Sequence, residues 1–219
     1  WRSEVTEDTQ SNIFHKAMPF TPRGEPSAIL TAAGTDAYVK LWRRTKGKLR
    51  PKTLWHAEFG GKVNRIRDAE VADLDGDGAP EIVVATHDQG VVAILWQRPH
   101  GKWKVERIYE RKGTFVHEIE IGDVDDDGVL EVYATPTPPN RFLDPSQTGD
   151  VVRFVPKRNE GPTVVAALGV RHAKEIYVGD VDGDGVDALY VPVEARMSGL
   201  GPNAKMLAPV EIRRYDADT

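Results

Sequence analysis

The sequence predicts an all-β protein that is built from repeated four-stranded antiparallel units. An Asp-rich segment occurs three times, its flanks alternate in hydrophobicity and are rich in β-branched residues, and Gly and Pro interrupt every window that would suit a helix. The copies begin at Asp73, Asp123 and Asp180, so they recur at roughly 50 to 57 residues, close to the length of one propeller blade. We therefore expect a β-propeller of about four blades, two of them partial, that forms part of a larger ring.

The N-terminal part of the chain has the weakest strand pattern. Residues 1–26 contain Pro19, Pro22 and Pro26 and little periodicity, so we expect an irregular arm there. The first blade, residues 27–58, is expected to lack the Asp-rich loop and the strand before it. Its three expected strands are Ser27–Ala33, Tyr38–Arg43 and Thr53–Glu58.

The next two blades, residues 59–112 and 113–170, each show four strand-like segments joined by short links. In the second blade these are Asp68–Leu74, Glu81–Thr86, Val91–Gln97 and Trp103–Tyr109. In the third blade they are Glu118–Val124, Glu131–Thr135, Val151–Val155 and Thr163–Leu168.

The fourth blade, residues 171–219, shows only three strand-like segments, which are Lys174–Val181, Ala188–Val193 and Val210–Tyr215. Unpaired strands at a blade edge invite pairing with another strand. We therefore expect the ring to be completed by sequence beyond this chain or by another chain.

The composition fits a single globular unit and excludes several classes. The chain has 219 residues, 40% of them hydrophobic, a formal charge of −5 and no cysteine. A disulfide-stapled fold is therefore excluded, and the scattered basic residues argue against nucleic acid as a partner. The longest apolar runs are far shorter than the roughly 20 residues of a membrane-spanning helix. Because the chain begins with Trp1, we expect a processed form or a fragment.

The Asp-rich segments have the chemistry of a cation site. In the first, Asp73, Asp75 and Asp77 stand at positions 1, 3 and 5, and Gly78 follows where the chain must turn sharply. Carboxylates held this close repel one another unless a cation lies between them, and Ca²⁺ prefers six to eight oxygen ligands. An EF-hand is excluded because its position 12 needs an acid. The residues at that position here are Val84, Ala134 and Val191.

A nine-residue D-x-D-x-D-G-x-x-D/E loop between two strands resembles the calcium loops of the FG-GAP and VCBS repeat family, a loop that integrin α-subunit propellers also carry. Phe59-Gly60 is similar to the first half of the FG-GAP element, whereas Ala85-Thr86-His87 stands where Gly-Ala-Pro would follow the second strand. That departure favours the VCBS-like branch.

The resemblance implies three calcium sites. Their ligands would be Asp73, Asp75, Asp77, the Ala79 carbonyl and Glu81 in the first loop; Asp123, Asp125, Asp127, the Val129 carbonyl and Glu131 in the second; and Asp180, Asp182, Asp184 and the Val186 carbonyl in the third. The ninth position of the third loop is Ala188, and Asp187 would point the other way along a strand. We therefore expect two strong sites and one weaker site.

A second candidate surface lies at the other end of the first strand of each blade. An acidic residue lies five positions before each lead aspartate, and a basic residue comes directly before that acid. The resulting pairs are Arg67-Asp68, His117-Glu118 and Lys174-Glu175. These pairs would ring the channel mouth, as a site for a ligand or partner or as structural ion pairs between blades. Two insertions, Pro136–Asp150 with Arg141 and Phe142, and Glu194–Pro209, would emerge on the same face.

The expected function is binding or scaffolding outside the cytoplasm, with a protein or glycan partner. Weak calcium modules bind at about 10⁻⁴–10⁻³ M, which suits an extracellular or periplasmic location. Two alternatives remain open at this stage. The first is an enzyme, because the chain is similar to some polysaccharide lyases that carry calcium on propellers of such repeats. The second is a structural subunit or cleaved half of a larger extracytoplasmic assembly. No catalytic motif such as Gly-x-Ser-x-Gly stands out in the sequence.

Overall fold

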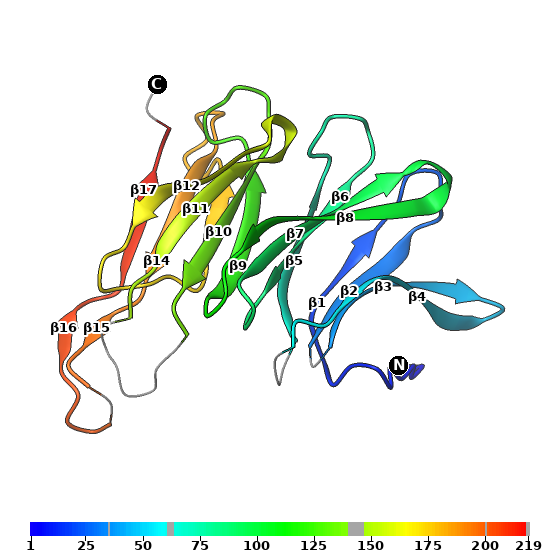
Figure 1. The fold of residues 1–219 in the computed structure, drawn as a ribbon, viewed down its shortest axis with the longest axis horizontal. Coiled ribbons are helices and arrows are strands. Elements are labelled where there is room, and N and C mark those ends of the chain that lie inside the picture. The colour runs from blue at the N-terminus through cyan, green and yellow to red at the C-terminus, as the bar shows by residue number, and fades with distance from the viewer. Residues whose placement is uncertain (35, 61–63, 140–146, 200, 218–219) are drawn as a thin grey trace.

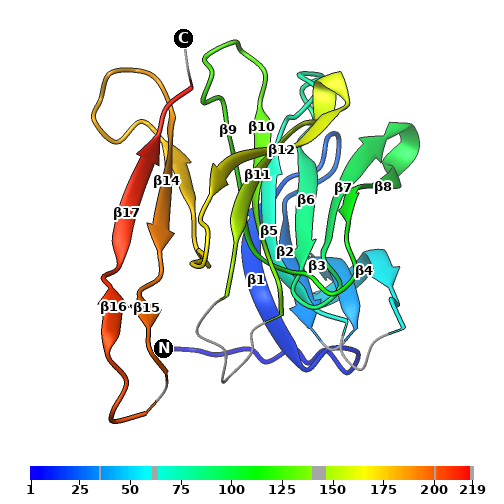
Figure 2. The same ribbon diagram turned by 60° about the vertical axis from the view of Figure 1, so that its left-hand side comes forward.

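The chain folds into a row of antiparallel β-sheets that follow one another along an arc (Figures 1 and 2). The structure is a computed structural model, and it describes residues 1–34, 36–60, 64–139, 147–199 and 201–217. Three sheets have four strands and one has three, and in each four-stranded sheet the strands pair in chain order. This meander is the arrangement of a propeller blade. The predicted all-β, blade-like architecture is therefore confirmed.

The sheets have the following bounds. The first contains β1 (Ile13–Phe20), β2 (Ala28–Gly34), β3 (Ala37–Thr45) and β4 (Lys48–Ala57), and the second contains β5 (Ile66–Ala72), β6 (Glu81–Thr86), β7 (Val91–Arg98) and β8 (Lys102–Glu110). The third contains β9 (Phe115–Gly122), β10 (Glu131–Thr137), β11 (Asp150–Val155) and β12 (Glu160–Ala167). The fourth contains β13 (Tyr177–Gly179), β14 (Ala188–Val193) and β17 (Glu211–Tyr215), and β15 (Arg196–Met197) pairs with β16 (Met206–Ala208) in a separate hairpin.

The N-terminal segment differs from the prediction. Residues 13–20 form β1 and pair with β2 over their whole length, so the irregular arm predicted for residues 1–26 is wrong for residues 13–20, and the first sheet has four strands. Pro19 is compatible with this strand because β1 lies at the edge of its sheet, where a missing N–H need not break the ladder. The described residues therefore form three complete four-stranded blades and one partial blade of three strands. The sequence predicted two complete blades and two partial ones.

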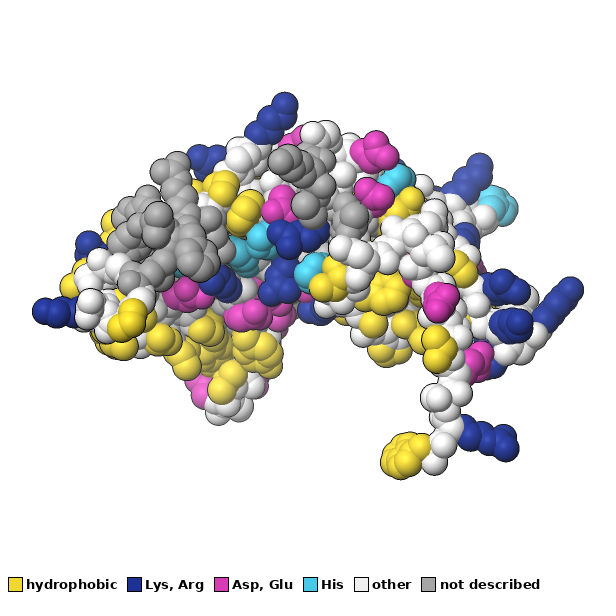
Figure 3. All heavy atoms as spheres, turned by 90° about the horizontal axis from the view of Figure 1, so that it is seen from below, with side chains coloured by type: hydrophobic (Ala, Val, Ile, Leu, Met, Phe, Trp, Pro, Cys, Tyr) yellow, Lys and Arg dark blue, Asp and Glu magenta, His cyan; other side chains and the backbone are white. Residues whose placement is uncertain are grey.

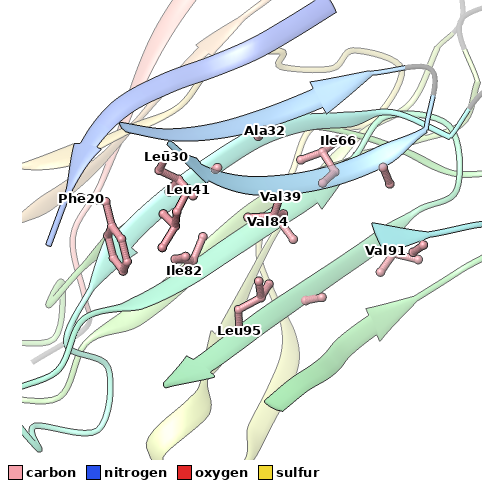
Figure 4. Close-up of a cluster of buried hydrophobic side chains, with 14 of the residues drawn as sticks. Phe20, Leu30, Ala32, Val39, Leu41, Ile66, Ile82, Val84, Val91 and Leu95 are labelled. Carbon is pink, nitrogen blue, oxygen red and sulfur yellow. The ribbon is translucent and has the colours of Figure 1, made fainter. Parts of the chain in front are cut away.

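The hydrophobic core lies between successive sheets. Leu30 and Leu41 of the first sheet pack in one cluster with Ile82 of the second, as Figure 4 shows. Two further clusters join the second sheet to the third and the third to the fourth. All six residues of β6 are buried, because β6 lies inside its sheet and is covered by neighbouring sheets on both faces. The core therefore fixes the orientation of each sheet relative to the next.

Candidate metal centres

Each Asp-rich loop connects the first strand of a sheet to the second. Loop 1 (73–81) joins β5 to β6, loop 2 (123–131) joins β9 to β10, and loop 3 (180–188) joins β13 to β14. Because the sheets follow one another in the same orientation, the loops lie at one common end of the molecule, at the top of Figure 1.

The lead aspartate of each loop organises the backbone around itself. In loop 1, one oxygen of Asp73 accepts hydrogen bonds from the N–H groups of Gly76 and Asp77 at 2.9 and 3.0 Å, and the other accepts from Gly78 at 2.8 Å. Asp180 accepts the same three bonds in loop 3, at 2.6, 3.1 and 2.9 Å. The tight curl requires positive φ at position 6, where Gly78 has φ +83°.

The curl brings the carboxylates of each loop together. Ligand oxygens of three acids lie within 4.8 Å of one another in every loop. The acids concerned are Asp73, Asp75 and Glu81 in loop 1, Asp123, Asp125 and Asp127 in loop 2, and Asp180, Asp182 and Asp184 in loop 3. The first two predicted aspartates of every loop therefore lie close together, and the third close acid is Glu81 in loop 1 and the third aspartate in loops 2 and 3.

The ninth position separates the first two loops from the third. Glu81 and Glu131 are buried, and each accepts a hydrogen bond from the backbone N–H at the second position of its loop, at 3.0 and 2.9 Å. Burial and, after it, the charges of the neighbouring loop aspartates together raise the pKa of Glu81 to about 7, against the opposing effect of the hydrogen bond from Leu74. A cation would relieve this unfavourable negative charge. In loop 3, buried Ala188 provides no oxygen at this position.

Asp187, the acid next to Ala188, serves the neighbouring loop instead. Its Oδ2 lies 3.4 Å from the backbone nitrogen of Asp123 and against Gly122, where a β-carbon would come within 3.1 Å of it. Because Asp187 points toward loop 2, it does not complete the ligand set of loop 3.

Arginines from other elements contact the carboxylates of every loop. Arg23, between β1 and β2, pairs with Asp77, and Arg214 of β17 pairs with Asp182. In loop 2, Arg153 of β11 contacts both Asp125 and Glu131. These contacts balance part of the negative charge, so a bound metal ion would compete with guanidinium groups for the same oxygens.

The donor set of loops 1 and 2 fits Ca²⁺. Each provides three aspartate side chains and a buried glutamate, all hard oxygen ligands without nitrogen or sulfur, on a loop whose curvature the lead aspartate already fixes. Loop 3 has the same curvature but is exposed and has one acid fewer at the ninth position.

At the opposite end of the first strands, the structure brings the predicted acid-base pairs together. Burial, followed by nearby charges that include those of Lys174 and Arg67, lowers the pKa of His117 to about 3. Glu118 lies near Asp68 and Glu175, and burial followed by these charges raises its pKa to about 9. Arg141 and Phe142, the other two predicted residues, lie outside the described residues.

Two features of this end were missed in the sequence. Lys16 of β1 bridges Asp68 and Glu70 of β5, with both N–O distances 2.7 Å. His15-Lys16 precedes Thr21 by the same offset at which Arg67-Asp68 precedes Asp73, so aligning the strands would have revealed the pair. Arg171 is buried and donates to backbone carbonyls at the base of the β15–β16 hairpin, and no repeat marks it in the sequence.

Comparison with known proteins agrees with the repeat. Residues 73–134 match the family model of the FG-GAP-like repeat. The chain contains an FG-GAP-like repeat. The match runs from the lead aspartate of loop 1 through loop 2 to β10, and it does not single out the VCBS-like branch, which stays a prediction. No curated protein matches the chain. Among the described residues, no helix is long and apolar enough to cross a membrane.

Proposed function

We propose that this FG-GAP-like chain is a calcium-stabilised propeller segment that acts as a binding or scaffolding module outside the cytoplasm. The observation that carries the proposal is that three acids lie within 4.8 Å of one another in each of three loops, all at the same end of the sheets. FG-GAP-like repeats are typical of β-propeller binding modules, and millimolar external calcium suits weak sites of this kind.

Loops 1 and 2 are the strong calcium sites of this proposal, and loop 3 is the weak one. The aspartates at positions 1, 3 and 5, the position-7 carbonyls of Ala79 and Val129, and the buried Glu81 and Glu131 would hold the ion. Loop 3 would use its three aspartates and the Val186 carbonyl, with water in place of the missing acid. Calcium would supply the charge that the arginines now balance only in part.

Further blades would complete the ring beside the two outermost sheets. Ile212 of β17 is 74% exposed and Tyr177 of β13 is 52% exposed, whereas apolar residues between the inner sheets are buried. At the other end of the arc, Phe14 and Ile29 are 44% and 42% exposed. Apolar side chains on both outermost sheets would be covered by blades from further sequence or from another chain, and the binding partner would be a protein or a glycan.

Calorimetric titration of the metal-free protein with calcium tests the metal part of the proposal. We expect two tighter binding events and one weaker event, and Asp75→Ala and Asp125→Ala should each remove one tight event. Asp36→Ala, at the turn between β2 and β3, is the control for loss of a carboxylate elsewhere. No heat of binding at millimolar calcium would refute the proposal.

A further inference from the structure

The first strand of each sheet carries an irregularity at the same place. β1 pairs with β2 through Phe14 and Lys16 but skips His15, and β5 pairs with β6 through Ile66 and Asp68 but skips Arg67. Each strand thus has one extra residue, which is a β-bulge.

The third and fourth sheets repeat this irregularity. In β9, two residues, His117 and Glu118, face the single Thr135 of β10. In the fourth sheet, three residues separate the pairs Ala173–Val193 and Tyr177–Tyr190 on one strand but only two on the other, so Lys174 lies in a stretch with one extra residue. We call His15, Arg67, His117 and Lys174 the bulge cluster. All four stand six residues before the lead position of their loops.

The bulge cluster lies at the end of the sheets away from the Asp-rich loops. Figure 3 views the molecule from that end and shows Lys, Arg and His side chains gathered between its two halves. The ring centroid of His87, from the β6–β7 turn, lies 5.0 Å from that of His117. Arg67 contributes to lowering the pKa of His15, His87 and His117, after burial in each case, so three imidazoles from different strands and turns experience its charge.

Among the described residues, Arg67 has no ion-pair partner, unlike the neighbouring cations Arg65 and Lys174. Arg65 is paired with Asp88 through two contacts of 2.7 and 2.9 Å, and Lys174 lies 3.0 Å from Glu194. Within the described ranges, no ion pair or hydrogen bond joins the Arg67 side chain to another residue.

Two of the surrounding imidazoles have unused hydrogen-bonding capacity. The Nε2 atoms of His15 and His117 are shielded from solvent and have no hydrogen-bond partner in the described part of the chain. His117 is only 3% exposed, and a buried polar atom without a hydrogen-bond partner is unfavourable. A ligand that accepts hydrogen bonds would recover part of this cost.

We propose that the bulge cluster binds a single carboxylate group of a ligand, with Arg67 as the charge partner and His15 and His117 as neutral N–H donors. A metal cation is disfavoured because the guanidinium of Arg67 has no ion-pair partner among the described residues, whereas the charges of Arg65 and Lys174 are balanced by Asp88 and Glu194. One unpaired guanidinium matches one negative charge and presents two parallel donors to a planar carboxylate. A phosphate dianion would bring one charge too many for this site.

This proposal deepens the binding role proposed above and does not depend on calcium. The bulges give these four side chains the same place in each sheet, because an extra residue in a strand re-aims its side chain without breaking the sheet. Asp68, the acid that follows Arg67 in its strand, does not cancel the charge of Arg67, because Asp68 pairs with Lys16 and accepts a hydrogen bond from the backbone N–H of Ile119 at 3.0 Å.

The test is a titration with sodium acetate at constant ionic strength, followed by the ¹⁵N resonances of the histidine side chains. We expect saturable shifts at His15 and His117. Arg67→Gln should weaken acetate binding by about tenfold or more, because it removes a charge-assisted bidentate contact. Arg50→Gln removes an exposed arginine of β4 and is the matched control, which should bind acetate as the wild type does.

Calcium titration of the same variants keeps the two proposals separate, because Arg67→Gln should leave calcium uptake unchanged. It also verifies that the variant is folded. An absence of saturable shifts in the wild type would overturn the carboxylate site, and so would unchanged acetate binding in Arg67→Gln. Inorganic phosphate binding more tightly than acetate would overturn the assignment of the site to a monoanion.

Discussion

The two ends of the first strands repeat in different ways. At the loop end, the same side chain recurs at the same position, as Asp73, Asp123 and Asp180, and in every loop it accepts hydrogen bonds from the backbone N–H groups at positions 5 and 6. At the bulge end, the backbone irregularity recurs but the side chain changes from His15 to Arg67 to His117 to Lys174.

The difference lies in what holds each backbone in place. In each loop the lead aspartate accepts hydrogen bonds from the backbone N–H groups at positions 5 and 6, so we expect its replacement to weaken the turn. The bulges are held by the strand pairing on either side, so the side chain at the bulge is free to vary. A repeated fold can thus keep one end chemically uniform while it diversifies the other.

The largest expected effect is the loss of a lead aspartate. In the presence of a chelator, Asp73→Ala should lower the free energy of unfolding by about 2–3 kcal/mol, because three N–H groups lose a charged acceptor. Urea denaturation measures this. Asp75→Ala is the control, since Asp75 accepts only one backbone bond, at 3.1 Å, and should cost less than about 1 kcal/mol. Equal losses of unfolding free energy in the two variants would show that the charge of the aspartate, and not its hydrogen bonds to the turn, determines stability.

The next effect concerns pH at the bulge end. Burial and neighbouring acids raise the pKa of Glu118 from 4.5 to about 9, so the folded protein binds this proton more tightly than the unfolded chain. The contribution of Glu118 to stability should therefore be fully present below about pH 4.5 and be lost as the pH rises toward 9. The slope cannot exceed about 1.4 kcal/mol per pH unit for one group.

Glu118→Gln should remove that slope. Denaturation of both proteins between pH 5 and 9 gives the comparison, and the control Glu110→Gln changes an exposed glutamate of β8. Parallel pH profiles of wild type and Glu118→Gln would contradict the shifted pKa.

A smaller effect should follow from restoring the ninth acid of loop 3. Ala188→Glu is expected to tighten calcium binding at this loop by about tenfold, or about 1.4 kcal/mol, because loops 1 and 2 carry a buried glutamate there. Ala188→Gln has the same size without the charge and should bind calcium no better than the wild type. The weak calorimetric event is the readout, and no gain with glutamate would mean that Ala188 does not limit the site.

The smallest effect is expected at the bulges themselves. Lys174→Gln should change the free energy of unfolding by less than about 1 kcal/mol, because its pair with Glu194 is partly exposed and the strand pairing maintains the backbone. Thermal unfolding of the variant beside wild type measures this. If Lys174→Gln lost as much unfolding free energy as Asp73→Ala, the side chains at the bulges would matter for stability as much as the lead aspartates, contrary to the expected difference.

The sequence predicted the strands next to the repeated Asp-rich loops well, and it predicted segments without such a loop poorly. Strands β6 and β10 were placed to within two residues, because the Asp-rich loops mark where they begin and their apolar runs are buried on both faces. β1 was missed because three prolines lie in or after it and no Asp-rich loop follows. The strand is defined instead by its pairing with β2, a long-range contact that local patterns do not encode.

The candidate site divides in the same way. Spacing alone placed the aspartates of each loop side by side, because they lie within nine residues of one another. The arginines that reach the loops, such as Arg23 and Arg153, come from distant segments and could not be assigned from the sequence. The orientation of Asp187 toward Asp123 likewise depends on how two sheets pack.

The anchoring of the β15–β16 hairpin has a mechanical consequence. The guanidinium of Arg171 donates to the carbonyl oxygens of Val193 at 3.2 Å, Glu194 at 2.9 Å and Pro209 at 2.6 Å, and so joins both strands at the root of the hairpin. A hairpin tied in this way has no hinge at its base. A force on the tip of the hairpin would therefore be transmitted through its base to β14 and β17.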